Sequence, residues 1–398
     1  MEIPFSPPDV TEAEIAEVVD TLRSGWITTG PKTKRFEREI AAYCHTAKAV
    51  CLNSATAGLE LVLRLLGVGP DDEVITSAYT YTASASVIDH VGAKIVLVDV
   101  KKDTAEMDYD ALEKAITERT KVVIPVDIAG VCCDYDTIYK IVERKKSLFH
   151  PANEIQQKFG RAIVLADAAH SFGATYRGKK SGEIADFSSF SFHAVKNLTT
   201  AEGGAVTWKS RADLDDEEIY RALTLLSLHG QSKDALAKTK LGAWEYDIVT
   251  LGYKCNMTDI MASIGLAQLS RYDGLLRRRE EIYSRYYDAL SPLGVSFLTQ
   301  KTAFGKGSFH LCIVRLPDRS EKERNDFIVR MAEKGVATNV HYKPLPMHSA
   351  YQKYGFDIKD YPNAYDYYHN EVTLPLHTLL TDEQVGYVIR SFTECYER

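Results

Sequence analysis

The stretch FSFHAVKN, residues 190–197, places a single lysine, Lys196, after a run rich in aromatic residues. Such a run is typical of a buried strand, so Lys196 is expected in the loop that follows it. A lone lysine in a loop is usually solvated, because lysines are rarely buried. The alternative is an amine held in a pocket for covalent chemistry. The residues that accompany Lys196 along the chain decide between these two interpretations.

Length and composition indicate an ordinary globular protein with a large core. The chain has 398 residues, of which 45% are hydrophobic and 26% are charged. This length exceeds what one core usually organises, so two domains are expected. The larger domain is predicted to span residues 1–270 and the smaller one residues 271–398, with the N-terminal segment packing partly on the smaller domain.

Charge and terminal sequence favour a soluble, cytoplasmic protein. The net charge is −7 and basic residues form no long run, which argues against a nucleic-acid partner. The start MEIPFSPPDV lacks the features of a signal peptide, and the longest apolar stretches are too short to span a membrane. Seven scattered cysteines without a CxxC spacing are typical of reduced thiols, so neither disulfides nor a metal site are expected.

Short apolar runs alternate with helical patterns in the first two thirds of the chain, which predicts βαβ units. The expected strands are residues 48–52, 73–76, 94–98, 121–126, 162–166, 187–192 and 204–208. Helices are expected between most of them, at residues 57–66, 82–90, 109–115 and 135–143. The sequence therefore predicts an α/β fold with a mainly parallel seven-stranded sheet sandwiched by helices.

The pattern changes at about residue 270. A charged helix at 276–290, a strand-like HLCIVRL at 310–316, a helix at 321–334 and a final helix ending at Arg398 predict a smaller α/β domain. Before that, the charged and amide-rich stretch KKSLFHPANEIQQKFGR, residues 145–161, is expected to be an inserted loop or short helix pair on the surface.

Polar residues follow several predicted strands, at the edge where parallel sheets bind ligands. Ser54 to Gly58 lead into a helix whose free N–H groups suit a phosphate, although a simply capped helix start has the same pattern. Asp167 ends another strand, either as a helix cap or as the counter-ion of a cationic ring. Tyr79 and Tyr81 follow a third strand, where a tyrosine packs in the core or stacks on a flat ring.

These features fit one chemical task when they are taken together with Lys196. Pyridoxal phosphate needs phosphate donors, a carboxylate at its pyridine nitrogen, an aromatic clamp on its ring and a lysine that captures its aldehyde. The chain supplies all four in a workable order. The sequence therefore predicts a pyridoxal-phosphate enzyme.

The motifs that carry these residues resemble the DegT-type nucleotide-sugar aminotransferases, a family of fold-type I pyridoxal-phosphate enzymes. The similar stretches are SGWITTGPKTKRFE, NSATAGL, ADAAHSFGA, FSFHAVKNLTTAEGGA, LGYKCNMTDIMASIGLAQL and LPLHTLLTDEQV, which together run nearly from end to end. The chain is most similar to the branch that aminates UDP-4-keto sugars, of the UDP-4-amino-4-deoxy-L-arabinose type.

The resemblance implies roles for individual residues. Lys196 would bind the cofactor and move the proton between substrate and cofactor, Asp167 would keep the pyridine nitrogen protonated, and His170 would lie beside the ring. The other implied cofactor contacts are Tyr81 on the ring, Ala55, Thr56 and Ser191 at the phosphate, and Asn256 at the phosphate of the neighbouring subunit's cofactor. The implied substrate residues are Thr29, Glu202, His341 and Tyr342.

The expected function is the transfer of an amine from L-glutamate, which leaves as 2-oxoglutarate, to a nucleotide-linked keto sugar. Amination at C4 is expected, by a homodimer with shared active sites, for cell-envelope glycan, lipopolysaccharide or related amino-sugar synthesis. The alternatives are a sugar 3-aminotransferase, a dehydratase of the same family, another lysine-dependent enzyme such as a cysteine desulfurase, and a non-catalytic regulator. Family dehydratases carry histidine in place of the lysine, so Lys196 argues against that alternative.

Overall fold

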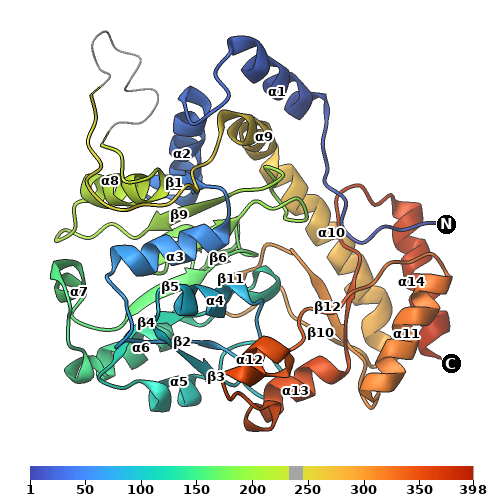
Figure 1. The fold of residues 1–398 in the computed structure, drawn as a ribbon. Coiled ribbons are helices and arrows are strands. Elements are labelled where there is room, and N and C mark those ends of the chain that lie inside the picture. Colours follow the sequence, from blue (N-terminus) through green and yellow to red (C-terminus); the bar gives the residue numbers. More distant parts are fainter. Residues whose placement is uncertain (233–244, 398) are drawn as a thin grey trace.

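The computed structural model describes residues 1–232 and 245–397, and a seven-stranded sheet forms the centre of its first part (Figure 1). In spatial order the strands are β1 (Ala49–Leu52), β9 (Gly204–Trp208), β8 (Phe187–Ser191), β5 (Ile163–Asp167), β4 (Thr120–Ile124), β2 (Glu73–Ser77) and β3 (Lys94–Val98). The neighbouring strands from β8 to β3 are parallel, whereas β9 runs antiparallel to both β1 and β8. The predicted α/β fold with a mainly parallel sheet is confirmed, although β4 ends at Ile124 and not at residue 126.

Helices cover both faces of this sheet because its strands are buried on both sides. They are α2 (Pro31–Cys44), α3 (Ala55–Leu65), α4 (Ala83–His90), α5 (Tyr109–Ala115), α6 (Tyr135–Arg144), α7 (Glu154–Phe159), α8 (Asp216–Ser227) and α9 (Asp259–Ser270). Helix α1 (Glu12–Ser24) packs on α9, away from the sheet. Along β5, Ile163 and Leu165 belong to one hydrophobic cluster, while Val164 and Ala166 belong to another. This alternation is the two-residue period of a strand between two layers.

A second, antiparallel sheet of three strands lies in the C-terminal part. It consists of β10 (Ser296–Phe297), β12 (Cys312–Arg315) and β13 (Glu371–Leu374). The helices of this part are α10 (Tyr272–Leu290), α11 (Glu321–Glu333), α12 (Ser349–Lys353), α13 (Pro362–His369) and α14 (Asp382–Tyr396). The division into domains at residue 270 stays a prediction. The final helix ends at Tyr396, and Arg398, where it was expected to end, lies outside the described residues.

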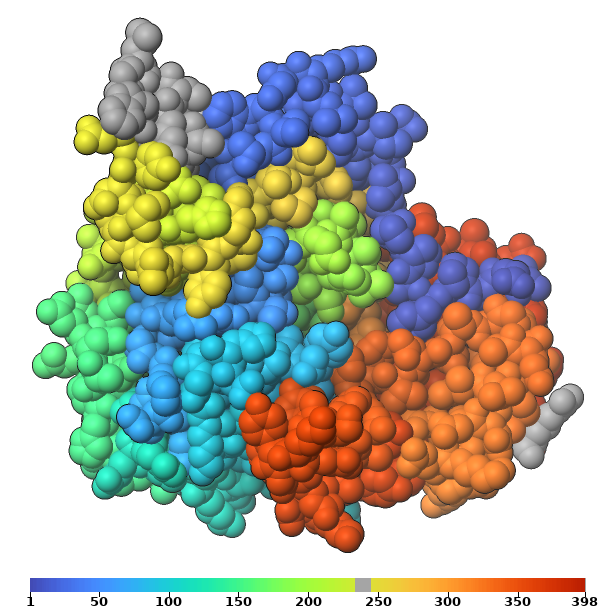
Figure 2. Space-filling view, in the orientation of Figure 1, coloured from blue at the N-terminus to red at the C-terminus, as the bar shows by residue number. Residues whose placement is uncertain are grey.

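The N-terminal arm, residues 1–10, runs along the C-terminal part of the molecule (Figure 2). Ile3 pairs with the loop after α11, since its N–H donates to the carbonyl of Gly335 at 2.8 Å and its carbonyl accepts from the N–H of Ala337 at 3.0 Å. Its side chain is buried in the same hydrophobic cluster as α14. A third small sheet joins β11 (Gly305–Lys306) to β6 (Thr175–Tyr176) and β7 (Lys179–Lys180).

The stretch at residues 145–161 forms a short 3₁₀ turn and helix α7, in agreement with the predicted helix pair. It is not only a surface feature, because one side is built into the core. The buried Gln156 amide donates to the carbonyl of Leu66 at 2.7 Å. Arg161 makes a two-point ion pair with the buried Asp186, at 2.8 and 2.9 Å.

Within the described residues, no helix is both long and apolar enough to cross a membrane.

Candidate active site

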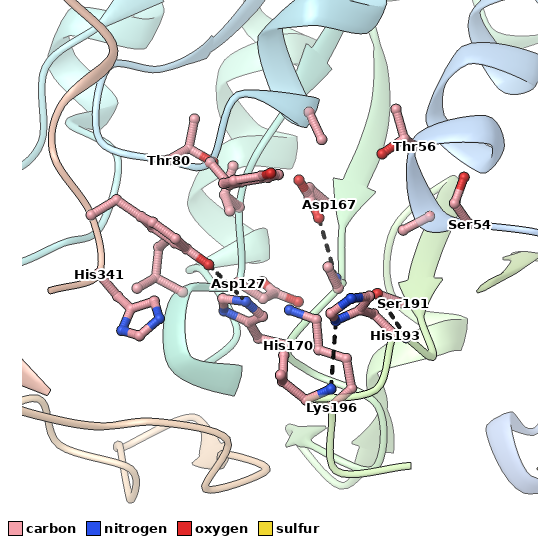
Figure 3. A pocket seen from close by; sticks show the side chains of 18 of the residues that line it. Ser54, Thr56, Thr80, Asp127, Asp167, His170, Ser191, His193, Lys196 and His341 are labelled. Atoms are coloured by element: carbon pink, nitrogen blue, oxygen red, sulfur yellow. Dashed lines mark hydrogen bonds between the residues drawn. The ribbon is translucent and has the colours of Figure 1, made fainter. Parts of the chain in front are cut away.

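A cavity of about 440 Å³ opens at the carboxyl ends of the central strands (Figure 3). Residues 339–342 of the C-terminal part close one side of it. Of the residues singled out from the sequence, the cavity brings together Ala55, Thr56, Tyr81, Asp167, His170, Ser191, Lys196, Glu202, His341 and Tyr342. The position at strand ends is where open α/β sheets bind their ligands.

Lys196 lies in the loop after β8, and its amine is available for chemistry. The loop is held by two hydrogen bonds. The backbone N–H of Lys196 donates to the carbonyl of His193 at 2.9 Å, and the side-chain amide of Asn197 donates to the carbonyl of Ser308 at 2.8 Å. Among the described residues, nothing is hydrogen-bonded to the amine itself. Burial lowers the pKa of the amine to about 8, against the opposing effect of the Asp167 carboxylate. Lys196 is therefore the pocket amine, and not a solvated lysine.

Asp167 ends β5 with its carboxylate in the cavity, and it is only 6% exposed. The hydroxyl of Ser84 donates to Oδ2 at 2.6 Å, and the N–H of Ala169 donates to Oδ1 at 3.2 Å. Burial raises the pKa of the carboxyl, while these hydrogen bonds oppose the rise. A buried carboxylate of this kind suits a protonated ring nitrogen. Sequence reasoning missed Ser84, since a serine inside a helix carries no signal of a partner 83 residues away.

The other end of the cavity is built for an anion. Helix α3 starts there with Ser54 as its cap, and the first backbone N–H groups, of Ala55 and Thr56, have no partner inside the helix. Ser191 adds a hydroxyl at the end of β8. A side chain could not replace Gly204 here, because a Cβ atom would lie 2.5 Å from the backbone nitrogen of Ala55. Free N–H groups at a helix start and a nearby hydroxyl fit a phosphate.

His170 and Tyr342 form a pair on the cavity wall. The N–H of Ala129 donates to Nδ1 of His170 at 3.2 Å, so the ring accepts at that nitrogen. Burial lowers the pKa of His170 well below its ordinary value, which leaves the ring neutral with its proton on Nε2. That proton points to the hydroxyl of Tyr342, 3.2 Å away. The Tyr342 hydroxyl therefore keeps its own proton for a partner inside the cavity.

Tyr81 and Glu202 line the open side of the cavity. The ring of Tyr81 is exposed and lies 5.8 Å from the ring of Tyr342, centre to centre. Glu202 lies 3.6 Å from Nε2 of His193, and both side chains are exposed. An exposed aromatic ring at the mouth of a pocket is free to stack on a flat ligand.

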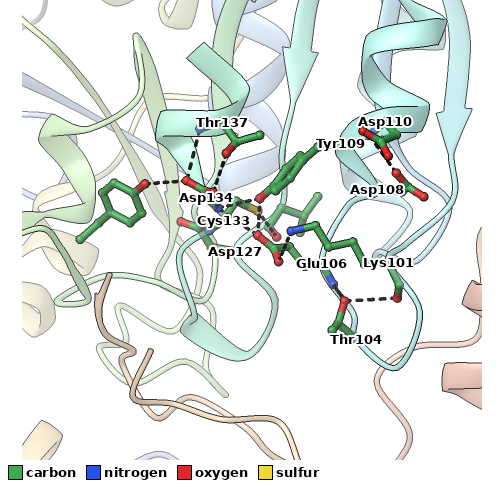
Figure 4. Close-up of polar contacts among 12 residues, drawn as sticks. Lys101, Thr104, Glu106, Asp108, Tyr109, Asp110, Asp127, Cys133, Asp134 and Thr137 are labelled. Atoms are coloured by element: carbon green, nitrogen blue, oxygen red, sulfur yellow. Dashed lines mark hydrogen bonds and ion pairs between the residues drawn. The ribbon is translucent and has the colours of Figure 1, made fainter. Parts of the chain in front are cut away.

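Asp127 also lines the cavity, but its carboxylate is occupied. It accepts from the N–H of Cys133 and the hydroxyl of Tyr135, both at 3.0 Å, and from the hydroxyl of Ser171 at 2.7 Å. Figure 4 shows this residue beside a second network, in which Asp134 and Glu106 hold the loop after β4. Burial raises the pKa of Asp127 to about 6. Its hydrogen bonds indicate a structural role behind the site.

Thr29 and Asn256 lie together, but outside this cavity. The side-chain amide of Asn256 donates to the Thr29 hydroxyl at 2.5 Å, and Lys254 donates to the amide oxygen. In a single chain neither residue lines the cavity that holds Lys196. Their predicted roles at the phosphate of a neighbouring subunit and at the sugar stay predictions.

The residues of the cavity fit pyridoxal phosphate. The Lys196 amine has no partner among the described residues, Asp167 is a buried carboxylate, and the start of α3 offers unpaired N–H groups. The model of the DegT/DnrJ/EryC1/StrS aminotransferase family matches residues 8–393. The chain belongs to this family. The resemblance seen in the sequence is thereby confirmed, and with it the fold-type I architecture.

Relatives of the family cover almost the whole chain. The Spore coat polysaccharide biosynthesis protein SpsC of Bacillus subtilis is 38% identical over 98% of this chain and 96% of its own length. The UDP-4-amino-4-deoxy-L-arabinose–oxoglutarate aminotransferase of Shewanella sediminis is 35% identical over 98% of this chain and 97% of its own length. The structure of Spr1654 from Streptococcus pneumoniae in its PLP form is 57% identical, with a TM-score of 0.97, over 100% of this chain and 99% of that one.

These findings establish the general activity. The DegT-family protein described here is a sugar aminotransferase that depends on pyridoxal phosphate. The predictions of an enzyme and of this cofactor are confirmed. When bound, the cofactor supplies an electron sink, and the residues of the protein hold it, orient it and move protons.

Proposed function

We propose that this enzyme moves the amine of L-glutamate onto the C4 keto carbon of a nucleotide-linked sugar, with UDP as the expected nucleotide. The relative from Shewanella sediminis, whose name specifies UDP-4-amino-4-deoxy-L-arabinose and oxoglutarate, supports the position, the nucleotide and the donor. The relative from Bacillus subtilis supports a role in polysaccharide synthesis. We place the reaction in the cytoplasm, where the product serves cell-envelope glycan synthesis.

The pairing of Lys196 with Asp167 in one cavity is the observation that carries this proposal. With a pKa of about 8, the amine of Lys196 takes and returns a proton near neutral pH, as a general base at the substrate carbon requires. Asp167, a buried carboxylate, would keep the pyridine nitrogen of the cofactor protonated. Ala55, Thr56 and Ser191 would hold its phosphate, and Tyr81 would stack on its ring.

The neutral His170 then has a defined task. Its ring lies in the cavity wall and donates to the hydroxyl of Tyr342, which in turn offers a proton to the phenolic oxygen of the cofactor or to the substrate. Glu202, His341 and Tyr342 line the same cavity and are the residues that we expect at the sugar.

We further propose a homodimer in which each site is completed by the partner chain. Ile248, Val249 and Leu251 are exposed on one segment, and Leu251 is 92% exposed. A cluster of exposed apolar residues of this kind marks a protein contact. The segment leads directly to Asn256, which is held against Thr29 outside the cavity of its own chain. A partner covering this segment would bring these two residues to the neighbouring cavity.

The test begins with the absorption spectrum of the purified holoenzyme. Addition of L-glutamate should shift the cofactor from its aldehyde form to its amine form, and subsequent addition of a UDP-4-keto sugar should reverse the shift. Reversal by a 3-keto sugar alone would move the reaction to C3. A spectrum that does not respond to glutamate would overturn the donor assignment.

A further inference from the structure

His341 is held from several sides at the edge of the cavity. Its ring stacks on Phe5 of the N-terminal arm, with the ring centres 5.6 Å apart and the planes 21° apart. The ring of Tyr342 packs against it edge to face, with the ring centres 5.0 Å apart and the planes at 82°. The backbone is fixed as well, since the hydroxyl of Tyr79 donates to the carbonyl of His341 at 2.8 Å. The imidazole therefore has one defined orientation before any ligand binds.

Two residues of β13 continue this network behind the cavity. Nδ1 of His341 lies 2.9 Å from the hydroxyl oxygen of Thr373, and that hydroxyl donates to Oε1 of Glu371 at 2.6 Å. Oε2 of Glu371 accepts from the backbone N–H of His341 at 3.0 Å. Both Glu371 and Thr373 are fully buried, and neither lines the cavity.

The direction of the hydrogen bonds in this network determines the tautomer of His341. A hydroxyl has one proton, and Thr373 gives it to the Glu371 carboxylate, so Thr373 can only accept from His341. Nδ1 of His341 therefore carries a proton. Burial lowers the pKa of His341 to about 3, so the ring is neutral and Nε2 is left with a lone pair.

Nε2 is also the nitrogen that a ligand can reach. In the described part of the chain this nitrogen has no hydrogen-bond partner, and it is not fully buried. Because His341 lines the cavity, this lone pair is open to it. Figure 3 shows His341 across the cavity from Ser54 and Thr56, at the end opposite the phosphate donors.

We propose that Glu371 and Thr373 are positioning residues that fix the tautomer of His341, so that Nε2 accepts a hydrogen bond from a hydroxyl group of the sugar. The sugar as ligand rests on the proposed function, whereas the tautomer rests on the network alone. An acceptor at this place selects a hydroxyl over a keto or deoxy centre, because a keto oxygen has no proton to donate.

Three variants and one control test the network. Thr373→Val removes the hydroxyl with little change of shape, and Thr373→Ser keeps it. In Glu371→Gln the amide oxygen faces the N–H of His341, so the amide NH₂ group donates to the Thr373 hydroxyl. That hydroxyl then donates to Nδ1 of His341, and the proton of the imidazole moves to Nε2. Thr338→Val is the matched control, since the buried Thr338 hydroxyl has no partner among the described residues.

The first measurement is the nitrogen NMR spectrum of ¹⁵N-histidine-labelled holoenzyme at alkaline pH, with His341 assigned by its loss in His341→Gln. We expect an Nδ1–H tautomer in the wild type, Thr373→Ser and Thr338→Val, and an Nε2–H tautomer in Glu371→Gln. An Nε2–H tautomer in the wild type, or no change in Glu371→Gln, would overturn the proposal. This outcome does not depend on whether the sugar substrate is assigned correctly.

The second measurement separates binding from chemistry. In Thr373→Val the KM for the keto sugar should rise about 5- to 10-fold, as expected for the loss of one oriented hydrogen bond. The rate of the reaction with glutamate should stay unchanged, and Thr373→Ser should restore the KM. If the tautomer changes but the KM does not, the proposed contact with the sugar is overturned. If no keto sugar accepts the amine while the NMR spectra are as expected, only the proposed function is overturned.

Discussion

The hydroxyl of Ser84 donates a 2.6 Å hydrogen bond to the carboxylate of Asp167, from the first turn of α4 to the end of β5. Both residues are buried, and Ser84 is itself bonded to the hydroxyl of Thr80 at 2.8 Å. This contact opposes the effect of burial, which otherwise raises the pKa of Asp167. Ser84 therefore helps to keep the Asp167 carboxylate ionised.

Removing that hydroxyl should weaken the site without unfolding it. In Ser84→Ala, Asp167 loses a hydrogen bond to its charged form, a contribution of about 1.5–3 kcal/mol. We expect the rate of the reaction with glutamate to fall about 10- to 100-fold. Stopped-flow absorbance measures this rate, with Ser86→Ala on the same helix as the control. An unchanged rate would show that Asp167 does not need Ser84.

The pKa of Lys196 predicts how the apoenzyme takes up its cofactor. Only the neutral amine attacks an aldehyde, and burial lowers the pKa of the amine from 10.5 to about 8. The uptake rate should therefore rise about tenfold per pH unit below pH 8 and level off above it. Rapid mixing of apoenzyme and pyridoxal phosphate across this range measures the profile.

Lys196→Ala is the control for that experiment. It should bind the cofactor without a covalent bond, so that reduction with borohydride followed by mass spectrometry finds no attached cofactor. A midpoint near the ordinary lysine pKa in the wild type would contradict the lowered value.

The sequence predicted the site residues at strand ends, but not those whose position depends on contacts between segments far apart in the chain. Asp167 and Lys196 follow apolar runs, so the general rule for parallel sheets brought them together. Thr373 reaches His341 only because the N–H of Thr373 pairs with the carbonyl of Asn339, at 2.7 Å. No local pattern predicts such a pairing between segments more than thirty residues apart, for the same reason that Ser84 was missed.

Helices α1 and α2 show a different reason for a missed element. Thr11 and Glu14 form a capping box, a start signal that the sequence contains, but both helices precede the first strand and so lie outside the βαβ pattern. The antiparallel direction of β9 was not predicted either, because the connection after β8, residues 192–203, is long enough for either strand direction.

The ion pair of Arg161 with Asp186 should be a large contribution to stability. Arg161 is 10% exposed and Asp186 is 2% exposed in this pair, so removal of one partner leaves a buried charge. Arg161→Ala should lower the free energy of unfolding by about 3–5 kcal/mol. The ion pair of Arg144 with Glu113 also has two hydrogen bonds, but it lies at the surface, so Arg144→Ala should lower the free energy of unfolding far less. Urea denaturation of both variants tests the contrast, and equal losses would contradict it.

Finally, the affinity for the sugar should increase as the pH rises through about 7. Burial raises the pKa of Glu371 from 4.5 to about 7, so the carboxyl is neutral below this pH and ionised above it. The neutral carboxyl would donate to Thr373 and move the His341 proton to Nε2, where it opposes a sugar hydroxyl.

The tyrosines and the histidine that face Glu371 in the described part of the chain do not titrate in this range. Arg324 on α11 donates to the backbone carbonyl of Glu371 at 2.8 Å. Tyr79, Tyr342 and Tyr367 have raised pKa values and stay neutral, and His341, with a pKa of about 3, is neutral as well. The KM for the keto sugar should therefore fall about 5- to 10-fold between pH 6 and pH 8. Glu371→Gln, which has no carboxyl to titrate, should have a high KM at both values; a pH-dependent KM in this variant would assign the titration to another group.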